Sequence, residues 1–576
     1  MRLPVLASLL LFSLLSAAQL PPTRFDRSGG SQTPAYQEAI SWWQEADRLS
    51  GKVKMLEMGM TDAGFPLHLV LVSENGDTDP GAIRRRNKRI ILFNNGIHPG
   101  EPDGIDASML LVKEVINRGY RLRDNVVVAI IPVYNIGGCL NRSADYRVDQ
   151  DGPEEFGFRG NSQNLDLNRD FIKSDSRDAR AFADIFQLLD PDVFVDNHVS
   201  NGADYQHVIT LLTSQHNKLG GEMGEFMHTR FEPSMYTRMK EKGHDMIPYV
   251  NFWGGNKVED GWQEFWDSPR YGSGYAALWN TFSFMPETHM LKPYRQRVEA
   301  TLALEKSFIE FTSAMSEQIR DVRDRAKQAT IKASSFPVKW TADRSVSRLI
   351  TFRGYSSGQK PSEVSGLPRL YYDRSKPYVR DIPFYDGYKV LDQVQVPQAY
   401  IIPQGWWKVI ELLRLNKVQM RAFRTDTLVE VEVYHIDDYK SAARPYEGHH
   451  PNSDIKIRVS REKVSYRKGD LYVPMNQLAN RFLVEVLEPH AEDSYFAWNF
   501  FDGILGQKEG YSAYSFEDIA AGYLKQDPDA RARLDQRRAA DSVFAKSGPA
   551  QLNFVYQQSK WFEPAYLRYP VTRVVK

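Results

Sequence analysis

The stretch that decides the fold is residues 89–101, RIILFNNGIHPGE, in which a short apolar run is followed by a histidine and a glutamate. Such a run is typical of a buried strand, and open α/β sheets bind ligands just beyond the carboxyl ends of their strands. Two further runs have the same arrangement, because residues 192–196 (DVFVD) precede His198 and residues 281–285 (TFSFM) precede Glu287. We therefore expect three strands to bring these polar side chains to one edge of a sheet.

Helices are expected beside these strands. Apolar residues recur at helical spacing in residues 105–116 and 182–189, and a long helical stretch runs from about residue 293 to 327. Pro286 should end the third strand, because proline has no amide hydrogen to donate to a β ladder. The alternation of strands and helices predicts an α/β fold with a mixed, largely parallel sheet and helices on both of its faces.

His98, Glu101 and His198 supply two imidazoles and one carboxylate, which is the ligand set of a catalytic zinc. Three protein ligands leave the fourth tetrahedral position to a water molecule, whereas a structural zinc has four protein ligands. The first two residues lie three positions apart, and the third follows 97 positions later (198 − 101). The pattern predicts one Zn²⁺ per chain, with a close pair that fixes the ion and a distant segment that completes the site.

Four blocks stand in order along the chain: HPGE at 98–101, NLDLNRDF at 164–171, DNH at 196–198 and PETH at 286–289. Together they resemble the signature blocks of the zinc metallocarboxypeptidase family, of the carboxypeptidase A type. The resemblance extends from about residue 36 to residue 320 of the 576. It indicates a secreted, bacterial member of that family with a C-terminal extension.

The resemblance implies roles for the residues of the site. His98, Glu101 and His198 would bind zinc, and Glu287 would be the general base. Asp166 would accept a hydrogen bond from His98, which fixes the tautomer of the imidazole and raises its basicity.

Further roles concern the substrate. Asn168 and Arg169 would bind its terminal carboxylate, for which the planar guanidinium fork is suited. Arg159 resembles the arginine that polarises the scissile carbonyl. Arg142 competes with it for this role, and we prefer Arg159 because it leads directly into the block that contains Asn168 and Arg169.

The tyrosine that the family places near the pocket for the terminal side chain has no clean counterpart here by spacing. Tyr271 and Tyr275 are both candidates for substrate binding. The alternative, that either one is an ordinary packed tyrosine, remains open.

These residues predict an exported zinc carboxypeptidase, which hydrolyses the C-terminal peptide bond of peptides with a zinc-activated water and Glu287 as general base. One alternative is a zinc deacylase or cell-wall peptide amidase of the same architecture. Another is a catalytically inactive binding protein on this fold. The presence of every required residue type favours an enzyme, and the pair Asn168 and Arg169 favours a substrate with a free terminal carboxylate.

Compartment and partners follow from the amino terminus and the composition. Residues 1–18 read as a signal peptide, with a positive start, an apolar stretch too short to span a bilayer and a small-residue cleavage site. We therefore expect a secreted or periplasmic protein without a membrane span.

The chain has 73 basic and 73 acidic residues, which gives no reason to expect nucleic acid as a partner. Cys139 is the one cysteine, and we expect a buried, inert thiol.

Two large domains are expected after the signal peptide. Residues 36–327 form the catalytic domain, and residues 328–576 form a smaller α/β or β-rich module with terminal helices. Alternating apolar and charged residues at 429–433 and 455–459 predict half-exposed strands in this module. Helices are expected near residues 406–415 and 529–545. Glu447, His449 and His450 offer metal-binding groups, but adjacent histidines do not easily face one ion, and we interpret them as a solvated loop.

Overall fold

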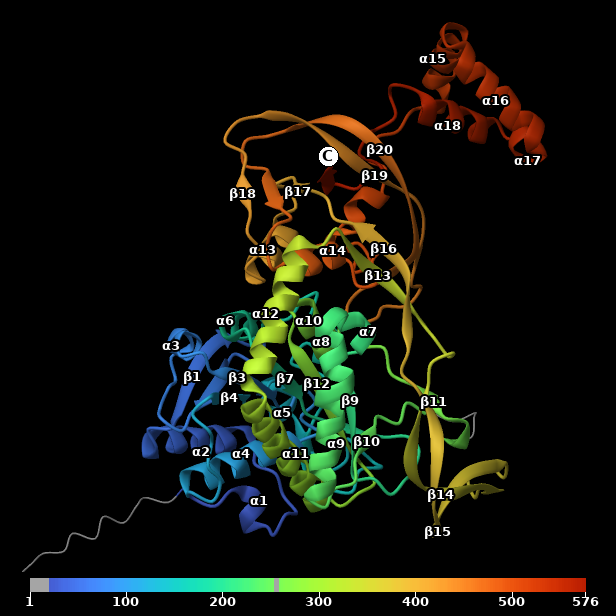
Figure 1. Ribbon diagram of the computed structural model, residues 1–576. Coiled ribbons are helices and arrows are strands. Elements are labelled where there is room, and N and C mark those ends of the chain that lie inside the picture. Colours follow the sequence, from blue (N-terminus) through green and yellow to red (C-terminus); the bar gives the residue numbers. More distant parts are fainter. Residues whose placement is uncertain (1–19, 253–257, 576) are drawn as a thin grey trace, which may run out of the picture. The chain divides into compact units, whose positions relative to one another are not determined.

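The computed structural model describes residues 20–252 and 258–575 (Figure 1). The expected signal peptide, residues 1–18, therefore lies outside the described residues. Within the described ranges, no helix is both long enough and apolar enough to cross a membrane. The chain divides into two compact units, of which the first comprises Met1–Thr330 and Trp340–Leu391 and the second comprises Ile331–Lys339 and Asp392–Lys576.

A mixed nine-stranded sheet forms the centre of the first unit. In spatial order its strands are β1 (Val53–Met60), β2 (Pro66–Val72), β4 (Val126–Ile131), β3 (Arg89–Asn94), β7 (Val193–Asp196), β12 (Phe282–His289), β9 (Ile209–Thr213) and β10 (Ile247–Pro248), and β8 (His198–Ser200) pairs with β12. The four central strands β4, β3, β7 and β12 are parallel. The pairs β1–β2, β2–β4 and β9–β12 are antiparallel, whereas β10 pairs with β9 in parallel. The prediction of a mixed sheet with a parallel centre is confirmed.

Helices cover both faces of this sheet, as predicted. Neighbouring residues of a strand point to opposite faces. Accordingly, Val195 packs in a core that contains residues of α4 (Asp103–Ile116) and α11 (Tyr294–Ala314), whereas Phe194 packs against Phe182 and Phe186 of α6 (Arg177–Leu189). The helical stretch expected from residue 293 to 327 forms two helices, α11 and α12 (Ser316–Lys332), with a break at Met315.

The expected end of the third strand at Pro286 is wrong, because β12 continues to His289. Up to Phe284, one side of β12 pairs with β7, and from Glu287 onward the same side pairs with β8. Pro286 therefore lies at the change of partners, where no ladder hydrogen bond from its nitrogen is needed on that side. The continued strand sets Glu287 in a fixed register with its neighbours.

Residues 340–391 belong to the first unit, although their sequence pattern predicts that they are part of the C-terminal module. They contain the long hairpin of β14 (Arg348–Pro361) and β15 (Pro368–Tyr385). β15 pairs with β11 (Trp262–Gln263). Phe352 and Ile382 pack in one apolar cluster with Trp262. The alternating strands thus look like a separate module in sequence, but they bury their apolar face against the first unit.

The second unit is β-rich with additional helices, as predicted. Its main sheet has six strands in the order β18 (Arg421–Ala422), β21 (Leu471–Pro474), β17 (Ala399–Ile402), β22 (Thr572–Val574), β19 (Thr427–Ser441) and β20 (Asn452–Tyr466). The alternating segments 429–433 and 455–459 lie in β19 and β20, which form a hairpin. The expected helices correspond to α13 (Trp407–Leu415), α16 (Pro528–Ala540) and α17 (Ser542–Ala545), and the last two share a small core with α15 (Ala513–Gln526) and α18 (Gly548–Gln558).

Candidate active site

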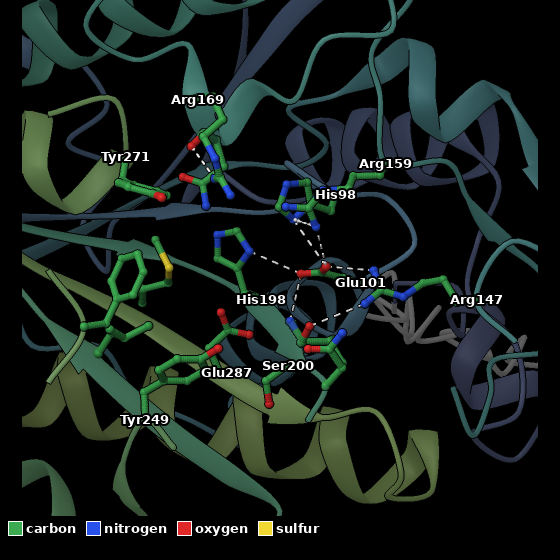
Figure 2. A pocket seen from close by; sticks show the side chains of 16 residues that line it. His98, Glu101, Arg147, Arg159, Arg169, His198, Ser200, Tyr249, Tyr271 and Glu287 are labelled. Carbon is green, nitrogen blue, oxygen red and sulfur yellow. Dashed lines mark hydrogen bonds and ion pairs between the residues drawn. The ribbon is translucent and has the colours of Figure 1, made fainter. Parts of the chain in front are cut away.

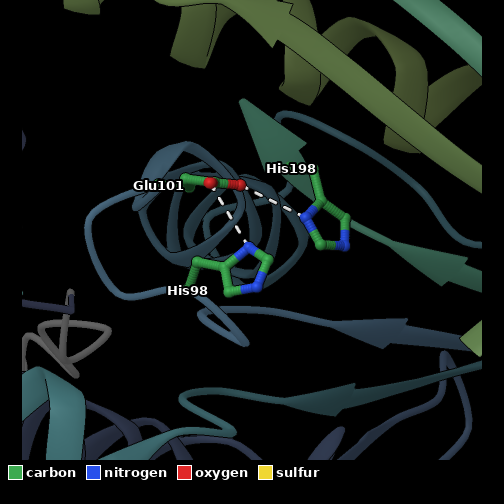
Figure 3. A group of neighbouring side chains, drawn as sticks. All are labelled: His98, Glu101 and His198. Atoms are coloured by element: carbon green, nitrogen blue, oxygen red, sulfur yellow. Dashed lines mark hydrogen bonds and ion pairs between the residues drawn. The ribbon is translucent and has the colours of Figure 1, made fainter. Parts of the chain in front are cut away.

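The three predicted metal ligands come together at the carboxyl edge of the central sheet. His98 lies in the loop after β3, Glu101 lies just before α4, and His198 is the first residue of β8. All three are buried, and their ligand atoms lie within 4.8 Å of one another (Figure 3). In the part of the chain that the structure describes, no second group of this kind is found. His449 and His450 therefore do not form a metal-binding group with their neighbours.

Each imidazole has one nitrogen at the centre of the group and the other beside a carboxylate. Nδ1 of His98 lies 3.3 Å from Oε1 of Glu101, and Nδ1 of His198 lies 3.2 Å from Oε2. On the outer side, Nε2 of His98 lies 2.8 Å from Oδ1 of Asp166. Nε2 of His198 lies 3.1 Å from Oδ2 of Asp196. Outer carboxylates of this kind orient an imidazole for metal binding. Sequence reasoning did not assign this role to Asp196, although it lies in the DNH block.

Glu101 is held as a carboxylate by the charges around it. Burial opposes its ionisation, but His98 and Arg147 hold the pKa of this carboxyl group well below its usual value. Arg147 donates from Nη1 to Oε1 at 2.7 Å. The backbone amide of Val199 donates to Oε2 at 2.8 Å. Sequence reasoning missed Arg147, because it lies outside the four signature blocks and no spacing points to it.

Glu287 faces the same centre from β12. In the parallel pairing of β12 with β8, its partner in the register is His198. The side chain is half-buried, and its Oε2 is covered and has no hydrogen-bond partner among the described residues. Burial raises the pKa of Glu287 to about 8, against the lowering effect of His198. The group is therefore suited to exchange a proton near neutral pH.

A cavity of about 340 Å³ joins these side chains to several of the predicted substrate-binding residues (Figure 2). Its lining comprises His98, Glu101, Arg147, Arg159, Asn168, Arg169, His198, Val199, Ser200, Asn201, Leu212, Tyr249, Phe265, Tyr271, Met285 and Glu287. The residues missed by the sequence analysis include Tyr249 and Phe265. They come from connecting segments in which no periodic pattern marks a position.

Of the two arginines considered for the scissile carbonyl, Arg159 lines the cavity. It donates to Oδ2 of Asp166 from Nη2 at 2.8 Å and from Nε at 3.1 Å. Its Nη1 lies 3.3 Å from Nδ1 of His98. Arg142 instead donates to the backbone carbonyls of Thr33 and Pro34 and is not part of the lining.

Arg169 and Asn168 lie on another side of the cavity, in the short helix η1 (Leu167–Arg169). The guanidinium carbon of Arg169 lies 4.5 Å from the centre of the Tyr271 ring, a cation–π distance. Nη1 of Arg169 donates to the carbonyl of Asn168 at 2.8 Å. Oδ1 of Asn168 is buried and has no partner among the described residues.

The two candidate tyrosines differ in position. Tyr271 caps α10 (Gly272–Leu278) and lines the cavity. Tyr275 lies inside that helix, is 1% exposed and does not line the cavity. Its ring packs between Phe171 and Phe186, at centroid distances of 6.3 and 5.3 Å. Tyr275 is therefore a core residue, and its assignment to substrate binding is corrected here.

The grouped donors, the carboxylate of Glu287 beside them and their place at the sheet edge are the features of a metal-dependent hydrolase. Residues 39–204 match the family model described as zinc carboxypeptidase. The chain therefore carries a domain of the zinc carboxypeptidase family, the metallocarboxypeptidases. The matched range includes the three grouped ligands as well as Asn168 and Arg169, and it ends before Glu287.

Several solved structures resemble the chain distantly. A putative carboxypeptidase A from Shewanella denitrificans is 16% identical, with a TM-score of 0.37 over 50% of this chain and 70% of that one. Carboxypeptidase A from Helicoverpa armigera is also 16% identical, with a TM-score of 0.38 over 49% of this chain and 74% of that one. A metallo-carboxypeptidase from Pseudomonas aeruginosa, solved with (2-guanidinoethylmercapto)succinic acid, is 14% identical, with a TM-score of 0.36 over 50% and 70%. No curated protein sequence matches this chain.

Proposed function

We propose that the protein is an exported, zinc-dependent carboxypeptidase that hydrolyses the C-terminal peptide bond of peptides. The observation that carries this proposal is the shared cavity. Asn168 and Arg169, two groups suited to a carboxylate, line the same cavity as the three metal-binding side chains and Glu287. The proposal of export rests on the signal-like residues 1–18 alone.

The donor set fits a zinc ion. Two imidazole nitrogens and a carboxylate converge within 4.8 Å, and an outer carboxylate lies beside each imidazole. His98, Glu101 and His198 would hold the ion. Zinc held there would supply polarisation of the scissile carbonyl and would lower the pKa of the attacking water toward neutrality.

Glu287 would carry the proton. It would accept a proton from the attacking water and later donate it to the leaving amine, because no other carboxylate among the described lining residues is left for this task once Glu101 binds the metal. A cation on the neighbouring ligands would lower the raised pKa of Glu287 and so favour the ionised form that acts as a base.

Arg159 would stabilise the oxyanion that develops on the carbonyl oxygen. Its guanidinium is fixed by two hydrogen bonds to Asp166, and it lies beside the metal-binding group at His98. A donor that is already oriented toward the developing charge contributes about 3 to 4 kcal/mol to lowering a barrier of this kind.

Arg169 and Asn168 would bind the free terminal carboxylate of the substrate, with Tyr271 beneath the guanidinium. The distance between this pair and the metal would then decide which bond is cut. An enzyme that recognises the end of the chain in this way removes one residue at a time, whereas an endopeptidase has no need for a carboxylate clamp.

The test compares one peptide with a free and with an amidated carboxyl end, followed by mass spectrometry. The wild-type protein should remove residues stepwise from the free end and leave the amidated peptide nearly intact. Arg169→Ala should lose most of this preference, because a charge-assisted bidentate pair left half-made costs a few kcal/mol, on the order of 100-fold in turnover.

A matched control is Arg230→Ala, which removes an exposed arginine of the same unit and should keep the preference. Equal cleavage of both peptides by the wild-type protein would defeat the proposal in favour of an amidase or deacylase. Cleavage inside the peptide would indicate an endopeptidase, and no turnover by metal-loaded protein would favour a binding protein.

A further inference from the structure

We infer that Arg147 is a positioning residue for the metal site, which fixes the carboxylate of Glu101 so that one defined oxygen is presented to the metal. The inference deepens the proposed function and rests on it, because it assigns a task to a side chain of the same site. Arg147 lies 46 residues after Glu101, outside the four signature blocks.

The two oxygens of Glu101 are held from different sides. Nη1 of Arg147 donates to Oε1 at 2.7 Å, and the backbone amide of Val199 donates to Oε2 at 2.8 Å. A carboxylate with a donor on each oxygen has little freedom to rotate about its terminal bond. Metal ligands that are held by outer hydrogen bonds bind their metal more tightly. Figure 2 shows Arg147 beside Glu101, while Arg169 lies apart from this pair.

The arginine is built into the site rather than resting on its surface. Its side chain is 16% exposed, and Nε is buried without a hydrogen-bond partner among the described residues. A guanidinium that loses part of its hydration costs free energy unless a nearby opposite charge offsets this cost. The carboxylate of Glu101 supplies that charge for Arg147.

Gly100 leaves the space through which Arg147 reaches Glu101. A Cβ atom on Gly100 would lie 2.7 Å from Cδ of Arg147 and 3.0 Å from the carbonyl oxygen of Gly157. A side chain at this position would therefore displace the arginine from its approach to Glu101 and press on the carbonyl of Gly157.

The residues that directly follow Arg147 are held by two other parts of the unit. Gln150 donates from Nε2 to the carbonyl of Gly100 at 2.9 Å, which joins the segment to the metal-binding loop. Arg297 of α11, which is fully buried, donates to the carbonyls of Asp151 and Gly152 at 3.3 and 2.8 Å. These contacts hold Arg147 in place without help from a substrate.

The experiment measures zinc affinity by competition with a chromophoric chelator, using the full chain and zinc alone as the probe. Arg147→Ala should weaken zinc binding by about 10- to 100-fold. Arg147→Lys should recover part of this loss, because an ammonium supplies the charge without the planar fork. The KM for a peptide with a free end should stay unchanged, since Arg147 has no role at the carboxylate clamp, and Arg230→Ala should bind zinc like the wild type.

Gly100→Ala provides an independent variant. It should weaken zinc binding when Arg147 is present and have a smaller effect in the Arg147→Ala background, because both changes act on one contact. Thermal unfolding of the metal-free proteins identifies variants that have not folded, and in that case the zinc affinities of Arg147→Lys and Gly100→Ala decide the matter.

Zinc affinity within twofold of the wild type in folded Arg147→Ala would overturn the inference, as would a raised KM with unchanged zinc affinity, which would make Arg147 a substrate contact. The zinc measurement does not depend on turnover. If the protein binds zinc but has no carboxypeptidase activity, the proposed function is wrong. The role of Arg147 is still decided by the zinc affinities of its variants.

Discussion

Glu287 and His198 are paired residues in the register of the parallel strands β12 and β8. Partners in a parallel ladder project from the same face of the sheet, so the proposed base and one metal ligand have a relative position that the backbone fixes. The hydroxyl group of Thr210 on the opposite neighbour β9 donates to the carbonyl of Glu287 at 3.2 Å. The central geometry of the site is therefore a property of the sheet.

The first prediction concerns metal content. The purified protein should contain about one zinc ion per chain, and His198→Ala should lose it, because two remaining ligands do not form a stable tetrahedral site. Elemental analysis measures the metal. His450→Ala, which removes an exposed histidine of the second unit, is the control and should retain the zinc. Zinc retained in the His198 variant would contradict the assignment.

Glu287→Gln separates proton transfer from metal binding. The amide has nearly the same size as the carboxylate but does not accept the proton, so turnover should fall by at least about 100-fold. Zinc content measured on the same sample should stay unchanged, because Glu287 is not one of the three grouped ligands. If the variant turned over peptides at a near-normal rate, the base would have to lie elsewhere.

Asp106 should make the stability of the fold depend on pH. Burial raises the pKa of this carboxyl group to about 7, and its Oδ1 has no hydrogen-bond partner among the described residues. Between about pH 4 and pH 7 the folded protein keeps a proton that the unfolded chain has released. The free energy of unfolding therefore falls as pH rises through this window, by up to about 1.4 kcal/mol per pH unit.

Asp106→Asn should flatten that dependence, since the amide is neutral at every pH in the window. Urea unfolding at several pH values between 4.5 and 7.5 gives the free energy of unfolding of the wild type and of the variant. The difference between these two free energies should change with pH. Asp324→Asn, at an exposed position of α12, should leave the slope unchanged. Parallel pH profiles for wild type and Asp106→Asn would refute the role.

Phe352 should matter to the catalytic unit although it lies in the appended hairpin. Its ring is 1% exposed and lies 5.8 Å from the ring of Trp262 and 6.0 Å from that of Tyr205. Phe352→Ala should lower the free energy of unfolding by about 3 to 5 kcal/mol, because it leaves a cavity in this cluster. Chemical denaturation measures the loss. Val379→Ala, at an exposed position of β15, should change stability by less than about 0.5 kcal/mol.

The local sequence determined the strands, the helices beside them and the three residues that come together as metal ligands. Continuous apolar runs form buried strands wherever helices cover both faces of a sheet, so residues 89–93 and 192–196 could be recognised without further information. The polar residues that follow them had to lie at one edge, because parallel strands end on the same side.

The tertiary structure alone decided which residues complete the site. Arg147 and Tyr249 reach it through contacts between segments far apart in the chain, and no periodicity records such contacts. Asp196 lies only two residues before His198, but the fold decides that its carboxylate lies beside the imidazole. The same holds for Tyr271 and Tyr275. The first is the N-cap residue of α10 and the second lies inside this helix, so their side chains have different surroundings. The hairpin at residues 348–385 has the pattern of any half-exposed sheet, and its partner is set by the apolar surface around Trp262, which only folding exposes to it.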